Sequence, residues 1–283
     1  KKAAEQGHVD AQYNLALSYK LGEGVEEDDE KAFLWYRRAA DQGDADAQVE
    51  LGQRYAYGKG VEEDQEKATE WYKKAADQGD AHAQSYLGFR YGNGEGVEED
   101  QEKAAGLYLK AAEQGNAIAQ YNLALSYELG EGVEEDYEKA AELYLKAAEQ
   151  GIADAQFNLA LRYGDGKGVE EDQEKAAEWY LKAAAQGYAD AQYNLALRYG
   201  NGKGVEENDE KAVYWYKKAA EQGQVSAQYN LGYSYGNGKG VEEDDEKAVY
   251  WYKKAAEQGY ANAQFNLALR YGSGEGVEED QEK

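Results

Sequence analysis

Residues 191–223 of the chain have the sequence AQYNLALRYGNGKGVEENDEKAVYWYKKAAEQG, and closely similar stretches recur along all of its 283 residues. The motif Ala-Ala-x-Gln-Gly begins at Ala3 and returns every 36 residues up to Ala255, without an insertion. A fixed period of this length is typical of repeat proteins, in which each unit packs on its neighbours. The sequence therefore predicts an array of eight repeats, which offers an extended surface more readily than a catalytic pocket.

Each repeat is predicted to form two helices, which we call helix A and helix B. In the fifth repeat, apolar residues recur at helical spacing from Ala155 to Tyr163. The glycine-rich residues 164–168 predict a loop, and the carboxylates after it suit the start of the next helix. Helix B carries an apolar stripe over 176–184 and is predicted to end at Gly187 in a left-handed conformation. One hairpin cannot bury its apolar stripe alone, so stacked neighbours are expected to form the core.

Small and large residues are distributed in a way that suits close packing of these helices. Ala or Gly follows a leucine that is present in every helix A. Tryptophan occupies one position of helix B in five repeats, and Leu107 and Leu143 replace it in two others. We expect the tryptophans to be buried between repeats; they are Trp35, Trp71, Trp179, Trp215 and Trp251.

The chain is strongly acidic, with 57 acidic and 31 basic residues and a formal net charge of −26. Phosphate recognition needs clustered Lys and Arg, so neither nucleic acid nor an anionic membrane is predicted as a partner. A basic partner would be attracted, although an acidic surface also serves solubility alone. No stretch approaches the length of a membrane span, and the absence of Cys excludes disulfides and thiolate metal sites.

The chain resembles the Sel-1-like repeat family, which is related to the tetratricopeptide repeats. The resemblance rests on Ala191-Gln192-Tyr193-Asn194-Leu195-Ala196-x-x-Tyr199-Gly200-x-Gly202-x-Gly204-Val205 and continues through Glu210-Lys211-Ala212-x-x-Trp215-Tyr216-x-Lys218-Ala219-Ala220-x-Gln222-Gly223. It covers the whole chain in eight registers. It implies an all-α fold, a right-handed α/α superhelix that acts as a protein-interaction scaffold. The family often has Pro after the loop valine, whereas this chain has Glu there in every repeat; we expect the fold to tolerate this, since a helix start does not require Pro.

The eight copies can also be compared with one another. The constant Ala, Leu and Tyr of helix A lie on one side of the helix. The variable positions lie roughly opposite, and in the first repeat they are Asp10, Tyr13, Asn14, Leu17 and Ser18. By analogy with tetratricopeptide repeats, this variable face is predicted to line a concave groove.

We predict that the variable face binds an extended peptide or protein segment. Aromatic side chains give contact area at low entropy cost, and Asn can pair with both the N–H and the C=O of a peptide. Residues at the same position of successive repeats form a column, and the column that begins with Ser18 contains arginine in several repeats; arginine can hold a carboxylate. The predicted partner-binding residues are Tyr13, Asn14, Val49, Glu50, Gln53, Arg54, His82, Ser85, Tyr86, Phe89, Arg90, Tyr121, Asn122, Phe157, Asn158, Arg162, Tyr193, Asn194, Arg198, Tyr229, Asn230, Tyr233, Phe265 and Asn266. Repeats two and three depart most from the common pattern, so they are predicted to set partner specificity.

Structural explanations for the same columns remain open. The aromatic residues can serve packing between repeats, and the repeated Asn can be a structural hydrogen-bonding residue. The divergence of repeats two and three is also compatible with neutral drift after gene duplication.

No enzymatic activity, metal site or cofactor is predicted. The glycine-rich loops follow a helix and lack the spacing of a nucleotide-binding loop. The two histidines, His8 and His82, are far apart in sequence, and neither Ser18 nor Ser126 has a lysine three residues later. The acidic segments lack the ligand spacing of a calcium-binding loop.

We predict one continuous array over residues 1–283 that is cut within a repeat at both ends, at Lys1 and Lys283. Uncapped ends of such an array expose apolar surface, which makes head-to-tail self-association an alternative function. Trimming of a longer array explains the same ends more simply. Consensus design is a third origin, since Cys, Met and Pro are all absent.

Overall fold

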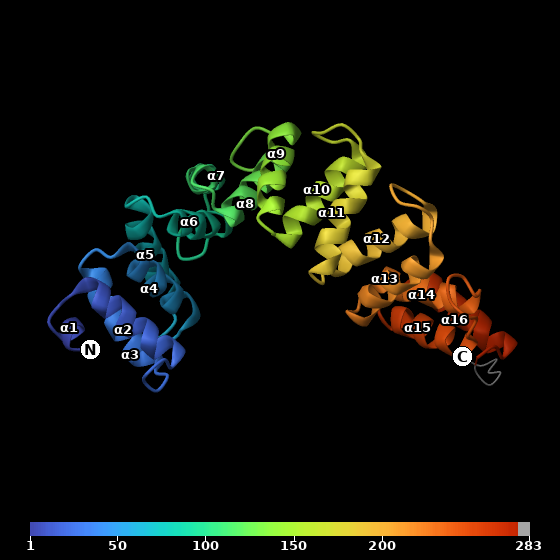
Figure 1. Ribbon diagram of the computed structural model, residues 1–283, viewed down its shortest axis with the longest axis horizontal. Helices are drawn as coiled ribbons and strands as arrows, with labels where there is room; N and C mark the ends of the chain where they lie inside the picture. The colour runs from blue at the N-terminus through green and yellow to red at the C-terminus, as the bar shows by residue number, and fades with distance from the viewer. Residues whose placement is uncertain (277–283) are drawn as a thin grey trace. The chain divides into compact units, whose positions relative to one another are not determined.

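The computed structural model describes residues 1–276, which contain sixteen helices and no strand (Figure 1). The prediction of an all-α fold built from two-helix repeats is confirmed. The chain divides into two compact units, an N-terminal unit of residues 1–146 and a C-terminal unit of residues 147–283. The predicted break at Lys283 lies outside the described residues.

The helices of each unit follow one another at short intervals. Those that begin in the N-terminal unit are α1 (Lys2–Glu5), α2 (Val9–Leu21), α3 (Asp29–Asp41), α4 (Ala45–Tyr57), α5 (Gln65–Asp77), α6 (Ala81–Asn93), α7 (Gln101–Glu113), α8 (Ala117–Leu129) and α9 (Tyr137–Glu149). Those of the C-terminal unit are α10 (Ala153–Asp165), α11 (Gln173–Ala185), α12 (Ala189–Asn201), α13 (Asp209–Glu221), α14 (Val225–Gly236), α15 (Asp245–Glu257) and α16 (Ala261–Ser273). From α2 onward, even-numbered helices are helix A and odd-numbered helices are helix B.

Aspartate at the loop end and glycine at the helix end set the helix boundaries. The side chain of Asp172 accepts a hydrogen bond from the backbone N–H of Lys175 and so caps the start of α11. At the other end of α11, Gln186 is the C-cap residue and the next residue, Gly187, has a positive φ of +92°, as predicted.

The predicted start of the loop at Gly164 is wrong. Helix α10 continues through Gly164 and Asp165 and ends at Gly166, which has the left-handed conformation. Position 164 has no room for a larger residue, because the Arg198 side chain of the next repeat packs against it. A Cβ at 164 would lie 2.9 Å from a guanidinium nitrogen of Arg198. Packing with the next helix A therefore outweighs the weak helix propensity of glycine.

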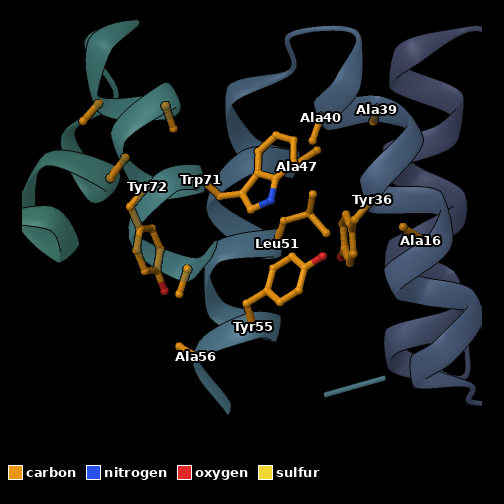
Figure 2. Close-up of a cluster of buried hydrophobic side chains, with 14 of the residues drawn as sticks. Ala16, Tyr36, Ala39, Ala40, Ala47, Leu51, Tyr55, Ala56, Trp71 and Tyr72 are labelled. Atoms are coloured by element: carbon orange, nitrogen blue, oxygen red, sulfur yellow. The ribbon is translucent and has the colours of Figure 1, made fainter. Parts of the chain in front are cut away.

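The core of each unit consists of fully buried leucine and tyrosine surrounded by alanine. Figure 2 shows Tyr36, Leu51, Tyr55 and Trp71 gathered between α3, α4 and α5. The burial predicted for the tryptophans holds for Trp71 and Trp179, whereas Trp35, Trp215 and Trp251 are half-buried. At the half-buried positions polar or aromatic neighbours cover part of the ring: the Arg38 guanidinium lies 4.3 Å from the Trp35 ring centre, and Tyr214 and Tyr250 lie edge-on to the other two.

Glutamine side chains join successive helices across the core. The Gln48 side-chain amide of α4 donates to the backbone oxygen of Ala40 at 3.2 Å, and its oxygen accepts from Gln78 at the end of α5 at 2.8 Å. The same pair of bonds recurs in the C-terminal unit, where Gln192 bonds to Ala184 and Gln222. A buried amide with both groups satisfied ties three helices together, which accounts for the fixed glutamines of the repeat motif.

The second glycine of the loop packs against the preceding repeat. In the C-terminal unit Gly204 has a φ of +74°, and a Cβ there would lie 1.8 Å from the backbone oxygen of Gln173 at the start of α11. This loop therefore rests on the first turn of the preceding helix B, and glycine makes the approach possible. The same approach is made by Gly60, Gly96, Gly132, Gly240 and Gly276.

The aspartates that cap helix B are expected to make the stability of the fold sensitive to acid. A 2.6 Å hydrogen bond from the Lys67 side chain, with a second from the Lys67 N–H, holds the pKa of Asp64 below its ordinary value of 3.8. A carboxyl with a depressed folded-state pKa stabilises the fold above its unfolded pKa and loses that contribution as the pH falls through the folded value. We expect the midpoint temperature of thermal unfolding to decrease when the pH is lowered below 3.8. Asp64→Asn keeps the capping hydrogen bond and should make the midpoint temperature depend less on pH. A carboxyl NMR titration of Asp64 with a midpoint above 3.8 would contradict the expectation.

Candidate functional site

The aromatic column of helix A is half-buried and packs on tyrosines of helix B. The ring centres of Tyr13 and Tyr36 are 5.5 Å apart in the N-terminal unit, and those of Tyr193 and Tyr216 are 6.1 Å apart in the C-terminal unit. The corresponding residues Tyr121, Phe157 and Tyr229 make the same kind of contact, with Tyr144, Tyr180 and Tyr252. These rings therefore serve packing within each hairpin and keep an accessible edge.

Two residues of the asparagine column make local hydrogen bonds, whereas Asn230 and Asn266 bond to tyrosine side chains. The Asn14 side chain donates to the backbone oxygen of Asp10 at 2.7 Å, and Asn194 donates to that of Asp190 at 2.8 Å. Asn14 is exposed, and the others in the column are half-buried; they are Asn122, Asn158, Asn194, Asn230 and Asn266. The side-chain oxygen of Asn14 takes no part in the bond to Asp10, so the exposed side chain can still accept a hydrogen bond from a partner.

The arginine column lies inside the fold, whereas the sequence predicted that it lies on the binding face. Arg54, Arg90, Arg162 and Arg198 are all buried, and Arg54 is only 2% exposed. The Arg54 guanidinium bonds to the carboxylate of Asp29 at 2.9 Å and to the backbone oxygen of Lys59 at 3.2 Å. Arg90 and Arg198 bond in the same way to the first residue of the preceding helix B, so these arginines hold neighbouring elements together and are not free to contact a partner.

In repeats two and three the divergent residues come together around one hollow of about 130 Å³. It lies among α2, α4 and α6, which are the A helices of the first three repeats. Its lining residues are Tyr13, Asp46, Val49, Glu50, Gln53, Asp80, His82 and Tyr86. Six of these were predicted from sequence. Asp46 was missed although it lies in the same variable position as Asp10 and His82, and Asp80 was missed because it caps helix A, outside the variable positions.

Tyr86 is held in place at this hollow from two sides. Its ring stacks on Tyr72 with 5.1 Å between centres and 29° between planes, and its hydroxyl accepts a hydrogen bond from the Gln53 side chain at 3.1 Å. Tyr86 occupies the position that is asparagine in most repeats. In other repeats the tyrosine equivalent to Tyr72 packs on an aromatic residue of helix A, but that residue is Val49 here, and Tyr86 covers the Tyr72 ring instead. Phe89, one turn further along α6, is 46% exposed, whereas Ser85 and Arg90 are buried.

The hollow is rich in negative charge. Burial, followed by the charges of Asp44 and Asp80, raises the pKa of Asp46 above its ordinary value of 3.8. Glu50 is paired with Lys20 at 2.8 Å, while Asp80 accepts the backbone N–H that caps α6. Carboxylates that crowd one another in this way favour the approach of a cation.

The predicted residues near the end of the described chain are more exposed. Phe265 is 65% exposed, and Tyr233 is exposed beside the half-buried Tyr229 and Asn230. Asn266 donates to the Tyr229 hydroxyl at 3.4 Å. Head-to-tail self-association through the ends of the array stays a prediction.

Within residues 1–276, no cluster of three or more His, Cys, Asp and Glu side chains is placed to hold a metal ion. His82 lies 3.3 Å from the side-chain nitrogen of Asn116. No helix in this range is both long and apolar enough to cross a membrane.

Known structures of similar sequence share this architecture. One is c5321, a protective antigen of uropathogenic Escherichia coli strains with an SLR fold: it is 39% identical, with a TM-score of 0.94 over 99% of this chain. This chain spans 60% of the length of that protein. A Sel1 repeat protein from Oxalobacter formigenes is 40% identical, with a TM-score of 0.76 over 94% of this chain and 77% of its own. No curated protein sequence matches the chain.

The sequence pattern of the Sel1 repeat matches the chain eight times in succession. The matches cover residues 9–44, 45–80, 81–116, 117–152, 153–188, 189–224, 225–260 and 261–283. Each complete match contains one helix A and one helix B, so the matched repeat is the hairpin described above. The chain therefore belongs to the Sel1 repeat family.

Proposed function

We propose that the chain is a non-catalytic protein-interaction scaffold that binds an extended, basic segment of a partner protein along the helix A face of repeats two and three. The carrying observation is the acidic hollow among α2, α4 and α6, together with the exposed ring of Phe89, three residues after Tyr86 on α6. Sel1 and tetratricopeptide repeats are in general protein-interaction scaffolds, which supports the class of function.

The aromatic residues supply anchors that lose little entropy on binding. Tyr86 is already fixed by Tyr72 and Gln53, so a partner that packs on it pays little for ordering the side chain. Phe89 offers apolar area on the same helix, three residues further on, where i and i+3 side chains are neighbours. Aromatic anchors of this kind often carry a large part of the binding energy of an interface.

The carboxylates give the preference for a basic segment. An ammonium or guanidinium group that enters the hollow relieves the repulsion from Asp44 and Asp80, which adds to burial in raising the pKa of Asp46. The net charge of −26 also attracts a cationic partner from a distance, which accelerates association at low salt.

Replacement of both anchors tests this proposal. A peptide selected from a random library on the full chain should bind Tyr86→Ala/Phe89→Ala at least about 30-fold more weakly, because two hot-spot side chains are lost. Affinity is measured by calorimetry and helicity by circular dichroism. The matched control is Tyr214→Ala/Tyr250→Ala, which removes two rings that are each 53% exposed on helix B and should leave affinity unchanged.

A second variant tests the charge of the hollow without removing any packing ring. Asp46→Asn/Asp80→Asn removes two charges, and Asn retains the capping hydrogen bond of Asp80. We expect weaker binding of the selected peptide and a shallower salt dependence. Wild-type affinity in this variant and in the aromatic variant together would reject the proposed face.

A further inference from the structure

Arginine from helix A occupies the same position in several hairpins of the chain. The Arg198 guanidinium lies against the first residue of the preceding helix B, with hydrogen bonds of 2.8 Å to the Gln173 side chain and 3.3 Å to its backbone oxygen. A third bond of 3.3 Å reaches the backbone oxygen of Lys203 in the loop. Arg54 has equivalent partners in Asp29 and Lys59 of the N-terminal unit. The repeat thus contains a preformed set of acceptors for one guanidinium group.

An aromatic face and a glycine complete this arrangement. The guanidinium carbon of Arg198 lies 5.0 Å from the ring centre of Tyr180, and that of Arg54 lies 5.3 Å from the ring centre of Tyr36. Gly164 gives room for the Arg198 guanidinium, as described above. Stacking on an aromatic ring and several planar hydrogen bonds together favour guanidinium over other cations.

In the seventh repeat the arginine is replaced by Ser234, and a hollow of about 170 Å³ is present there. Its lining includes the equivalents of the groups that surround Arg198: Gly200, Asp209, Tyr216 and Lys239. The volume is several times the ~30 Å³ that one water molecule occupies in the liquid. The short serine therefore leaves the acceptors in place without the side chain that uses them in other repeats.

We propose that this hollow binds the guanidinium group of an arginine side chain from a partner protein. Asp209 supplies a carboxylate at the position where Asp29 bonds to Arg54, and Tyr216 supplies the ring at the position of Tyr36. The proposal deepens the proposed function, on which it rests for the presence of a basic partner.

The access and charge of the hollow fit a side chain that arrives from outside. Leu197, Asn230 and Tyr233 of helices α12 and α14 also line it, and Tyr233 is exposed, so the hollow opens beside the helix A face. Lys239 pairs with Asp209 at 3.2 Å, but its side chain is 47% exposed, and an ion pair of this kind is readily exchanged. An arriving guanidinium can take over the carboxylate with two parallel hydrogen bonds, which an ammonium cannot make.

The fourth repeat provides an internal comparison. Serine also replaces arginine there, at Ser126, but the facing first residue of helix B is the uncharged Gln101. Beside Ser234, by contrast, the arginine is absent and the facing residue is the charged Asp209. We therefore place the site at Ser234.

The test uses capped amino acids rather than the selected peptide. Acetyl-arginine amide is titrated into the full chain, and NMR shifts of residues 200–239 are followed, with acetyl-lysine amide as the comparison. We expect the arginine compound to bind about tenfold more tightly than the lysine compound, because only guanidinium binds in a bidentate manner.

Three variants decide the outcome. Ser234→Arg should fill the hollow with the chain's own guanidinium, abolish the arginine-dependent shifts and raise the thermal midpoint. Ser234→Ala should bind as the wild type does, and Asp209→Asn should lose the preference for arginine over lysine. Unchanged shifts in a folded Ser234→Arg variant, or equal binding of the two compounds by the wild type, would overturn the proposal. Because the selected peptide is not used, failure here is distinct from failure of the face on repeats two and three.

Discussion

Replacement of Trp179 by alanine is expected to lower the free energy of unfolding by about 3–5 kcal/mol. Trp179 is 8% exposed on α11, and the ammonium group of Lys182 lies 3.6 Å from its ring centre. Removal of the ring takes away buried apolar area and leaves a cavity that the surrounding helices fill only in part. In a repeat protein this loss also weakens the contacts with the adjacent repeats.

The measurement is denaturant unfolding followed by circular dichroism, with Trp251→Ala as the matched control. Trp251 occupies the same column but is half-buried, so its replacement should cost clearly less. Equal losses for the two variants, or unchanged stability of Trp179→Ala, would show that burial in this layer does not contribute as described.

Replacement of Gly204 by alanine is expected to disrupt the contact between the loop and the first turn of α11. A methyl group at this position would lie 1.8 Å from the backbone oxygen of Gln173, and backbone atoms cannot yield as the end of a flexible side chain can. The φ of +74° adds a penalty of about 1–2 kcal/mol for a residue with a Cβ. The total loss is therefore expected to exceed about 3 kcal/mol, in the range of the larger single-residue effects.

Gly187→Ala separates the two contributions. Gly187 also has a positive φ, of +92°, but a Cβ there meets no other atom within 4 Å. It should therefore show the conformational penalty alone, about 1–2 kcal/mol. Thermal and denaturant unfolding of both variants gives the comparison, and a loss for Gly187→Ala as large as that for Gly204→Ala would contradict the close approach of the loop.

Much of the fold was predictable because the repeat presents the same local signals eight times. The apolar spacing between Ala155 and Tyr163 is a property of one helix and appears directly in the sequence. The boundary at Gly164 was predicted wrongly because the glycine there serves packing and does not end the helix. It leaves room for Arg198, which lies 34 residues later in the chain, and this reason is not visible in the local sequence.

The candidate site was predictable to a lesser degree, for a related reason. Comparison of repeats shows which positions vary, but a variable position can face either a partner or the next helix. The arginine column varies between Arg and Ser, yet Arg54 faces Asp29 of the preceding helix B. The convergence of Glu50 and Tyr86 on one hollow, and the acceptors left around Ser234, depend on which helices are neighbours in space. Neither arrangement follows from the period alone.

The central claim is that a partner segment lies along the helix A face of repeats two and three, and site-specific photocrosslinking tests it most directly. A benzophenone amino acid is placed at Phe89 in one variant of the full chain and at Tyr250, an exposed ring of helix B, in another. Each variant is irradiated with the peptide selected on the wild-type chain. The account predicts a crosslinked product from position 89 and none from position 250. Crosslinking from position 250 without any from position 89 would contradict it.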